Sequence, residues 1–256
     1  MNKLWKALRL LAKIISVLLV IAAILILWFF SKFFFGRQEY DVWQEDAIAA
    51  IQEADAAADP VKQLQLLHCA VERYLHCTDM DKTTATQEAL KLLPRMQELQ
   101  QKHQLPPQCE AHYLHTLSTD SREEVELLGT FIRSGLYDFS DKSQWSGEYA
   151  SYLLNNLLED INAKRHGETV DAMKPLVLFL LQQGVRTTWM DAPETYTDPV
   201  LSAVYTRDAA FLHAVLDCGL PARGINNDGT PEAEARWQNS PDLIEILRSH
   251  PEPHPR

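Results

Sequence analysis

The segment from Cys109 to His115 contains residue types that often bind metal ions in proteins. If it is helical, Cys109, His112 and His115 follow one another at intervals of three residues and share one face. The pairs His68-Cys69 and His76-Cys77 could add ligands from a neighbouring helix. The simpler interpretation is that the cysteines are small buried residues or form one disulfide, with the histidines at the surface. Because no Cys-x-x-Cys pair accompanies these residues, we predict no metal site.

The chain also lacks the short motifs that carry common enzyme chemistry. It contains no Gly-rich phosphate loop, no Gly-x-Ser-x-Gly and no His-Glu-x-x-His. The carboxylates of Asp120, Glu123 and Glu124 could act as acid and base, but their position is typical of a helix start, where they interact with the positive end of the helix dipole. We therefore expect no enzymatic activity and no cofactor.

Charge is distributed unevenly along the 256 residues, which carry a net charge of −11. Six of the 24 basic residues precede Glu39, the first acidic residue, so 18 basic residues face 35 acidic ones in the rest, about −17. We call the part of the chain after residue 38 the body. A protein region this acidic is a poor nucleic-acid binder, because the phosphate backbone repels it. With 46% hydrophobic residues the chain is long enough for a sizeable core.

The N-terminal part of the chain contains a long hydrophobic segment. Residues 10–30 include one charge, Lys13, and are followed by further aromatic residues up to Phe35. About 20 helical residues cross the hydrocarbon core of a bilayer, so residues 10–35 are predicted to be a transmembrane helix in contact with lipid, with Trp28 at the interface. A cleavable signal peptide has a shorter apolar core and a small-x-small site, which this segment lacks.

Positive charge near the two ends of this segment predicts its orientation. Four basic residues lie at or before its start, and Lys32 and Arg37 follow it, which favours a cytoplasmic N-terminal tail, residues 1–9. The acidic body then lies in the periplasm of a bacterium, tethered to the inner membrane. The four cysteines, which are Cys69, Cys77, Cys109 and Cys218, tolerate an oxidising compartment, and three pairings stay open.

The first part of the body, residues 36–106, has the pattern of a helical bundle. Apolar residues recur at helical spacing over residues 41–59, 61–77 and 83–103. Trp43 is expected to pack within the first of these helices, which Pro60 ends, while Pro94 is placed to kink the third. Short polar breaks between them predict about three antiparallel helices.

The second part repeats itself. The segment that starts at Asp198 and ends at Gly219 aligns without a gap with a second segment that starts 32 residues later, at Thr230. Thr230 followed by Pro231 predicts an N-cap and a first helical turn. Gly219 is placed just past a helix end, and residues 226–229 have the composition of a tight turn.

These repeats resemble the ankyrin repeat, whose motif begins with threonine, proline, leucine, histidine, any residue and alanine. Thr230, Pro231 and Ala235 match that motif, and the copy before it matches at five positions, which are Pro199, Ala203, Leu212, Leu216 and Gly219. The two copies depart from the motif at its histidine, which is replaced by Leu201 and by Ala233. Two weaker copies are expected before these. One pairs residues 147–159 and 176–184 across an insertion at 161–170, and the other pairs residues 107–117 and 125–135.

The resulting fold class is all-α, a transmembrane helix followed by helical hairpins in an ankyrin-like solenoid over residues 107–250, with a tail at 251–256. The resemblance implies protein binding, since ankyrin proteins mostly bind other proteins. The loop that holds Trp189 would project beside the repeat surface, where an aromatic residue can act as a binding anchor. The candidate contact residues are Trp189, Tyr196, Ser202, Tyr205, Asn227, Asp228 and Trp237.

A strongly acidic surface favours a basic protein partner. A tethered, periplasmic binding surface without catalytic motifs leads to the hypothesis of an immunity protein that neutralises a secreted antibacterial effector. Two alternatives stay open: a scaffold or assembly factor of an envelope complex, and an envelope hydrolase or metal-binding protein that uses the Cys109 region. An adjacent toxin gene would favour immunity over a scaffold, and the metal content of the purified protein would test the third.

Overall fold

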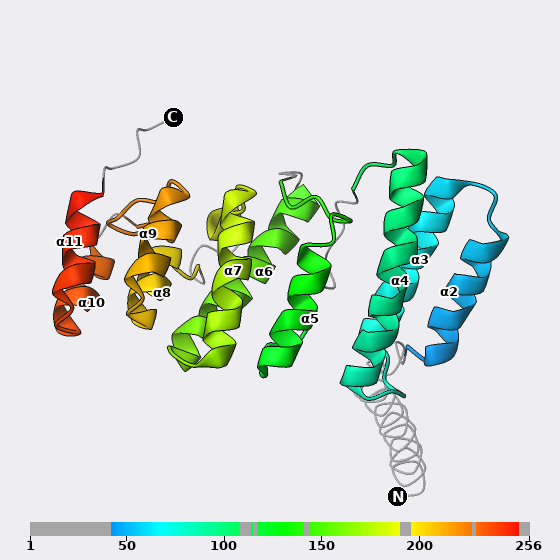
Figure 1. Cartoon of the computed structure of the whole chain (residues 1–256), viewed down its shortest axis with the longest axis horizontal. Helices are drawn as coiled ribbons and strands as arrows, with labels where there is room; N and C mark the ends of the chain where they lie inside the picture. Colours follow the sequence, from blue (N-terminus) through cyan, green and yellow to red (C-terminus); the bar gives the residue numbers. More distant parts are fainter. Residues whose placement is uncertain are drawn as a thin grey trace, which may run out of the picture.

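A computed structural model describes residues 42–107, 114, 117–140, 144–189, 196–226 and 229–250. In this part of the chain the regular elements are helices, and no strand forms, so the all-α class is confirmed (Figure 1). The elements in chain order are α2 (Gln44–Ala56), α3 (Pro60–Leu75), α4 (Lys82–His103), α5 (Arg122–Ile132), α6 (Gln144–Lys164), α7 (Glu168–Gln182), η2 (Thr187–Trp189), α8 (Pro199–Thr206), α9 (Ala209–Asp217), α10 (Thr230–Trp237) and α11 (Pro241–Ser249).

The predicted transmembrane segment, residues 10–35, lies outside the described residues, as do the two tails at 1–9 and 251–256. Among the helices that the structure does describe, none combines the length and the apolar character that crossing a bilayer requires.

The first three helices form an antiparallel unit in which α3 packs against both α2 and α4. This agrees with the three helices predicted between residues 41 and 104. Pro60 is the first residue of α3 and does not end α2, which stops at Ala56. The Asp59 carboxylate caps α3 by accepting a hydrogen bond from the Val61 amide at 3.2 Å, and a proline suits the position after such a cap.

Trp43 does not pack within the first helix, contrary to the prediction. Its side chain is 54% exposed at the N-terminal boundary of α2. The buried face of α2 consists of small side chains, Ala47, Ala50 and Ala54, which allow α3 to approach closely. A residue that precedes the first helical turn lies outside this face.

The remaining helices stand side by side along one axis in two layers (Figure 1). In one layer α6, α8 and α10 pack in succession, and in the other α5, α7, α9 and α11 do so. Each helix of the first layer also packs against the helix that follows it in sequence, which gives the hairpins α6–α7, α8–α9 and α10–α11. This is an array of helical hairpins in which contacts run between neighbours.

The 32-residue repeat of the sequence is visible in the burial pattern of the last two hairpins. Four positions are buried in both copies, namely Pro199 and Pro231, Ala203 and Ala235, Phe211 and Leu243, and Val215 and Leu247. The apolar side chains that the two copies share therefore fill the space between equivalent helices. Membership of the ankyrin family is a separate matter and stays a prediction.

Two details of the predicted repeats are wrong. Thr230 is the first residue of α10 and not its N-cap, which is Gly229 in a left-handed conformation at φ 76°. The expected insertion at residues 161–170 is mostly helix, because α6 continues to Lys164 and α7 begins at Glu168. Gly167, at φ 112°, reverses the chain in the short gap between them. The helix predicted at 107–117 falls largely on undescribed residues.

Polar side chains connect each hairpin with the next. Lys174 of α7 forms ion pairs with Asp171 at 2.7 Å and with Asp208, the N-cap of α9, at 2.8 Å. Burial disfavours the charged amine, but the hydrogen bonds to the two carboxylates raise the pKa of Lys174 overall. The Arg186 guanidinium donates to the Cys218 carbonyl oxygen at 2.9 Å. These connections fix the register of one hairpin on the next.

The three-helix unit packs on α5 and on the segment that follows α5. Within the described residues, α4 and α5 make only a small direct helix-to-helix contact. The amide group of Gln97 donates to the Ser134 carbonyl oxygen at 2.8 Å, and that of Gln100 donates to the Gly135 carbonyl oxygen at 3.3 Å. Apolar residues from both sides nevertheless belong to one continuous core.

His68 of α3 makes the fold sensitive to acid. Its ring is 6% exposed and meets the Tyr137 ring edge-on, with 5.4 Å between centroids. Burial lowers the pKa of His68 from 6.5 to about 4, so the unfolded chain takes up the proton first as the pH falls. We expect the free energy of unfolding to drop by about 2 kcal/mol between pH 7 and pH 5. Urea denaturation at both pH values measures the drop, and a His68→Leu variant should lose most of it.

Candidate binding site

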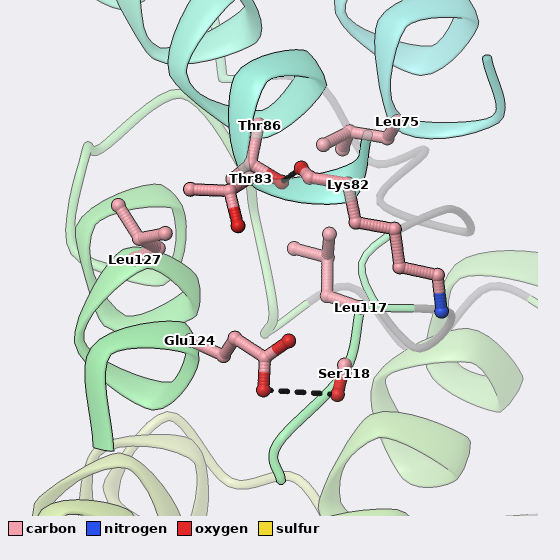
Figure 2. A pocket seen from close by; sticks show the side chains of 8 residues that line it. All are labelled: Leu75, Lys82, Thr83, Thr86, Leu117, Ser118, Glu124 and Leu127. Atoms are coloured by element: carbon pink, nitrogen blue, oxygen red, sulfur yellow. Dashed lines mark hydrogen bonds between the residues drawn. The ribbon is translucent and has the colours of Figure 1, made fainter. Parts of the chain in front are cut away.

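A small pocket lies where the three-helix unit meets α5 and the segment before it. Its volume is about 40 Å³, room for a few water molecules or the end of one side chain. Figure 2 shows the side chains around it. The apolar part of its wall comes from Leu75, Leu117 and Leu127, and the polar part comes from Lys82, Thr83, Thr86, Ser118 and Glu124.

Two helix caps hold the polar wall in place. Asp81 accepts a hydrogen bond from the Thr84 amide at 2.9 Å and so fixes the start of α4, from which Lys82, Thr83 and Thr86 project. At α5 the Ser121 hydroxyl accepts from the Glu124 amide at 3.2 Å, and Glu124 Oε2 accepts from the Ser121 amide at 2.9 Å. This capping box fixes the Glu124 carboxylate at the edge of the pocket.

The three acidic residues that were predicted to lie at the start of a helix do lie there. Glu123 and Glu124 belong to the first turn of α5, and Asp120 lies immediately before its N-cap, Ser121. The Ser118 hydroxyl lies 3.1 Å from a carboxylate oxygen of Asp120 and of Glu124, and its one proton is shared between these two acceptors. The carboxylates thus satisfy backbone and hydroxyl donors of this turn and do not form an acid–base pair.

A wider hollow continues from the pocket toward α6. Its volume is about 360 Å³, and it shares Lys82, Leu117 and Ser118 with the pocket. Its further lining includes three carboxylates, those of Asp120, Glu159 and Asp160. Asp160 accepts a hydrogen bond from the Thr119 hydroxyl, and Lys164 donates to the Thr119 carbonyl oxygen at 2.6 Å. Among the described residues, the lining of the two cavities includes four carboxylates and one amine, that of Lys82.

The predicted contact residues Tyr205 and Trp237 occupy equivalent positions of successive hairpins. They are 32 residues apart, near the ends of α8 and α10, which pack side by side. Trp237 is 76% exposed, the most exposed large apolar side chain in the described part of the molecule. Tyr205 is half-buried, and its ring lies under the Arg165 guanidinium, with 4.8 Å from the guanidinium carbon to the ring centroid. An aromatic pair of this kind can anchor a protein interface.

Of the other predicted contacts, Ser202, Tyr196 and Trp189 belong to the described residues. Ser202 is fully buried and its hydroxyl donates to the Asp198 carbonyl oxygen at 3.0 Å, so its prediction as a partner contact is wrong. A serine inside a helix often bonds to the carbonyl four residues earlier in this way. Tyr196 is half-buried ahead of α8, and Trp189 is the last residue of η2. Asn227 and Asp228 lie outside the described residues.

The metal-ligand candidates around Cys109, His112 and His115 are likewise outside the described residues. Within the described ranges no group of three or more His, Cys, Asp or Glu side chains is placed to hold a metal ion. The other cysteines, Cys69, Cys77 and Cys218, are free thiols. The Cys77 thiol donates to Asp79 at 2.7 Å, and burial raises its pKa.

The pocket has no combined signature in the sequence. Lys82, Thr83, Leu117 and Leu127 belong to three segments that no motif connects. One local signal was present, namely the Ser121-x-x-Glu124 spacing of a capping box, which indicates where the Glu124 carboxylate must be held.

Comparison with known proteins adds no relative: no family model, no curated protein and no solved structure matches the chain.

Proposed function

We propose that this chain is a membrane-tethered module that binds a protein partner through the face formed by α6, α8 and α10. The observation that carries the proposal is the exposure of Trp237, which is 76% accessible beside the equivalent Tyr205. A tryptophan on a rigid helix offers a large contact area and loses little conformational freedom on binding. The Lys174 and Arg186 connections between hairpins support such rigidity.

The class of partner follows from charge. The sequence after residue 38 carries about −17, because 35 acidic residues face 18 basic ones there. A field of this sign attracts a basic protein and accelerates its association. With residues 10–35 as an anchor and the body in the periplasm, we propose an immunity protein that captures a basic antibacterial effector at the inner membrane.

The residue to test is Trp237. The partner would be purified together with the full chain from native membranes. The rates at which it associates with and dissociates from the wild-type and Trp237→Ala chains would then be measured in detergent. We expect the dissociation rate to rise about tenfold or more while the association rate changes little, because a buried aromatic contact holds the formed complex. Trp43→Ala is the matched control, since that tryptophan is also exposed but precedes α2, which lies at the other end of the stack from α10 in Figure 1. Equal effects of the two variants would contradict the proposal.

A second experiment separates immunity from scaffolding. The identified partner would be expressed in the periplasm of cells with and without the chain. An immunity protein restores growth, and Trp237→Ala should reduce that protection in proportion to its faster dissociation. A partner that leaves growth unaffected when the chain is missing would favour an assembly factor.

A further inference from the structure

The pocket between α4 and α5 combines an apolar wall with a carboxylate at its edge. We propose that it receives one basic side chain, an arginine or a lysine, of the protein partner, an inference that rests on the proposed function. The cavity of about 40 Å³ admits the end of a side chain. Leu75, Leu117 and Leu127 would contact the aliphatic stem of that side chain, because long basic residues bury their methylene groups against apolar surface.

The Glu124 carboxylate is the group that would meet the charged end. Its Oε2 accepts the hydrogen bonds of the cap, from the Ser121 amide at 2.9 Å and from the hydroxyls of Ser118 and Ser121, both at 3.1 Å. Figure 2 shows the other carboxylate oxygen turned towards Leu117, inside the ring of lining residues. The cap therefore orients one oxygen and leaves the second to a ligand, and a charge-assisted hydrogen bond to a cation is stronger than a neutral one.

The charge of the surroundings selects a cation over an anion. Three further carboxylates, of Asp120, Glu159 and Asp160, line the adjoining hollow. Among the described lining residues the opposing charge is Lys82, which lines both the pocket and the hollow and whose amine lies on the side of Leu117 away from Leu127 in Figure 2. Lys82 would repel an incoming basic group without blocking the apolar wall. Removing its charge should therefore strengthen binding, whereas removing that of Glu124 should weaken it.

The test uses N-acetyl-arginine amide as the probe and the full chain in detergent micelles, with labelled leucine methyl groups followed by NMR. We expect the probe to shift the methyl signals of Leu75, Leu117 and Leu127. Glu124→Gln should raise the dissociation constant about fivefold or more, since glutamine preserves the capping box but carries no charge. Lys82→Gln should lower the dissociation constant.

Glu123→Gln is the matched control, because Glu123 is an exposed acid of the same helical turn that does not line the pocket. The proposal is overturned if N-acetyl-norleucine amide binds as well as the arginine probe, if N-acetyl-glutamate amide binds better, or if no wall leucine responds. The probe is not the partner, so this titration can fail while Trp237→Ala still weakens the complex, and the reverse can also occur. The two failures are therefore distinguishable.

Discussion

Replacing Leu216 with aspartate is expected to lower the free energy of unfolding by about 4 kcal/mol or more. Leu216 is fully buried on α9, in the core that this helix shares with its neighbours. An aspartate there would leave a charge without water and would remove apolar contacts at the same time. Urea denaturation of the full chain in detergent, followed by circular dichroism, measures the change.

His213→Asp provides the comparison for this variant. His213 is exposed on the same helix, so the same substituent should change the free energy of unfolding by no more than about 0.5 kcal/mol. An unaltered denaturation curve for Leu216→Asp would show that α9 does not pack as described, and the alignment of the two repeats would then be wrong at its best-matched helix.

Gly224→Ala should destabilise the junction between the last two hairpins by about 3 kcal/mol or more. An added Cβ would lie 2.4 Å from Oδ2 of Asp198 and 3.2 Å from Cδ of Pro231, at a backbone φ of 86°. That Asp198 oxygen accepts a hydrogen bond from the Ile225 amide at 3.0 Å, while the other caps α8. The side chain cannot move aside without breaking these bonds. Thermal or urea unfolding of the variant measures the loss.

Gly219→Ala separates backbone strain from this collision. Gly219 has a similar φ of 78°, but an added Cβ would meet no atom within 4 Å. We expect its cost to be only about 1 kcal/mol, that of placing a side chain in the left-handed region. If Gly224→Ala and Gly219→Ala lower the free energy of unfolding by the same amount, the contact between Asp198 and the turn at Gly224 contributes nothing to the stability of the junction.

Helices and their repetition could be predicted because their causes are local in sequence. Apolar spacing identified the three helices between residues 41 and 104, and the 32-residue shift identified positions such as Ala203 and Ala235 that are buried in both copies. Residue types that are typical of helix caps predicted the first residue of a helix less reliably. Thr230 is typical of an N-cap, but the positive φ available to Gly229 lets the helix begin one residue earlier.

The candidate site was harder to predict because it depends on contacts between distant segments. Trp237 is exposed at the end of α10, whereas Ser202 is buried because of how α8 packs against its neighbours. The pocket brings Leu75, Lys82, Leu117 and Leu127 together from segments with no shared pattern. Only the packing of the three-helix unit on α5 makes them neighbours.

The small interface between α4 and α5 has a mechanical consequence. In a stack whose contacts run between neighbours, a pulling force applied at the two ends acts on every interface in series. We expect the joint around α4 and α5, which Gln97, Gln100 and the contact of His68 with Tyr137 hold together, to yield first, so that the helices α2, α3 and α4 part from the rest as one block. Tension on the chain would therefore lengthen the molecule at this joint and leave the spacing of Tyr205 and Trp237 unchanged.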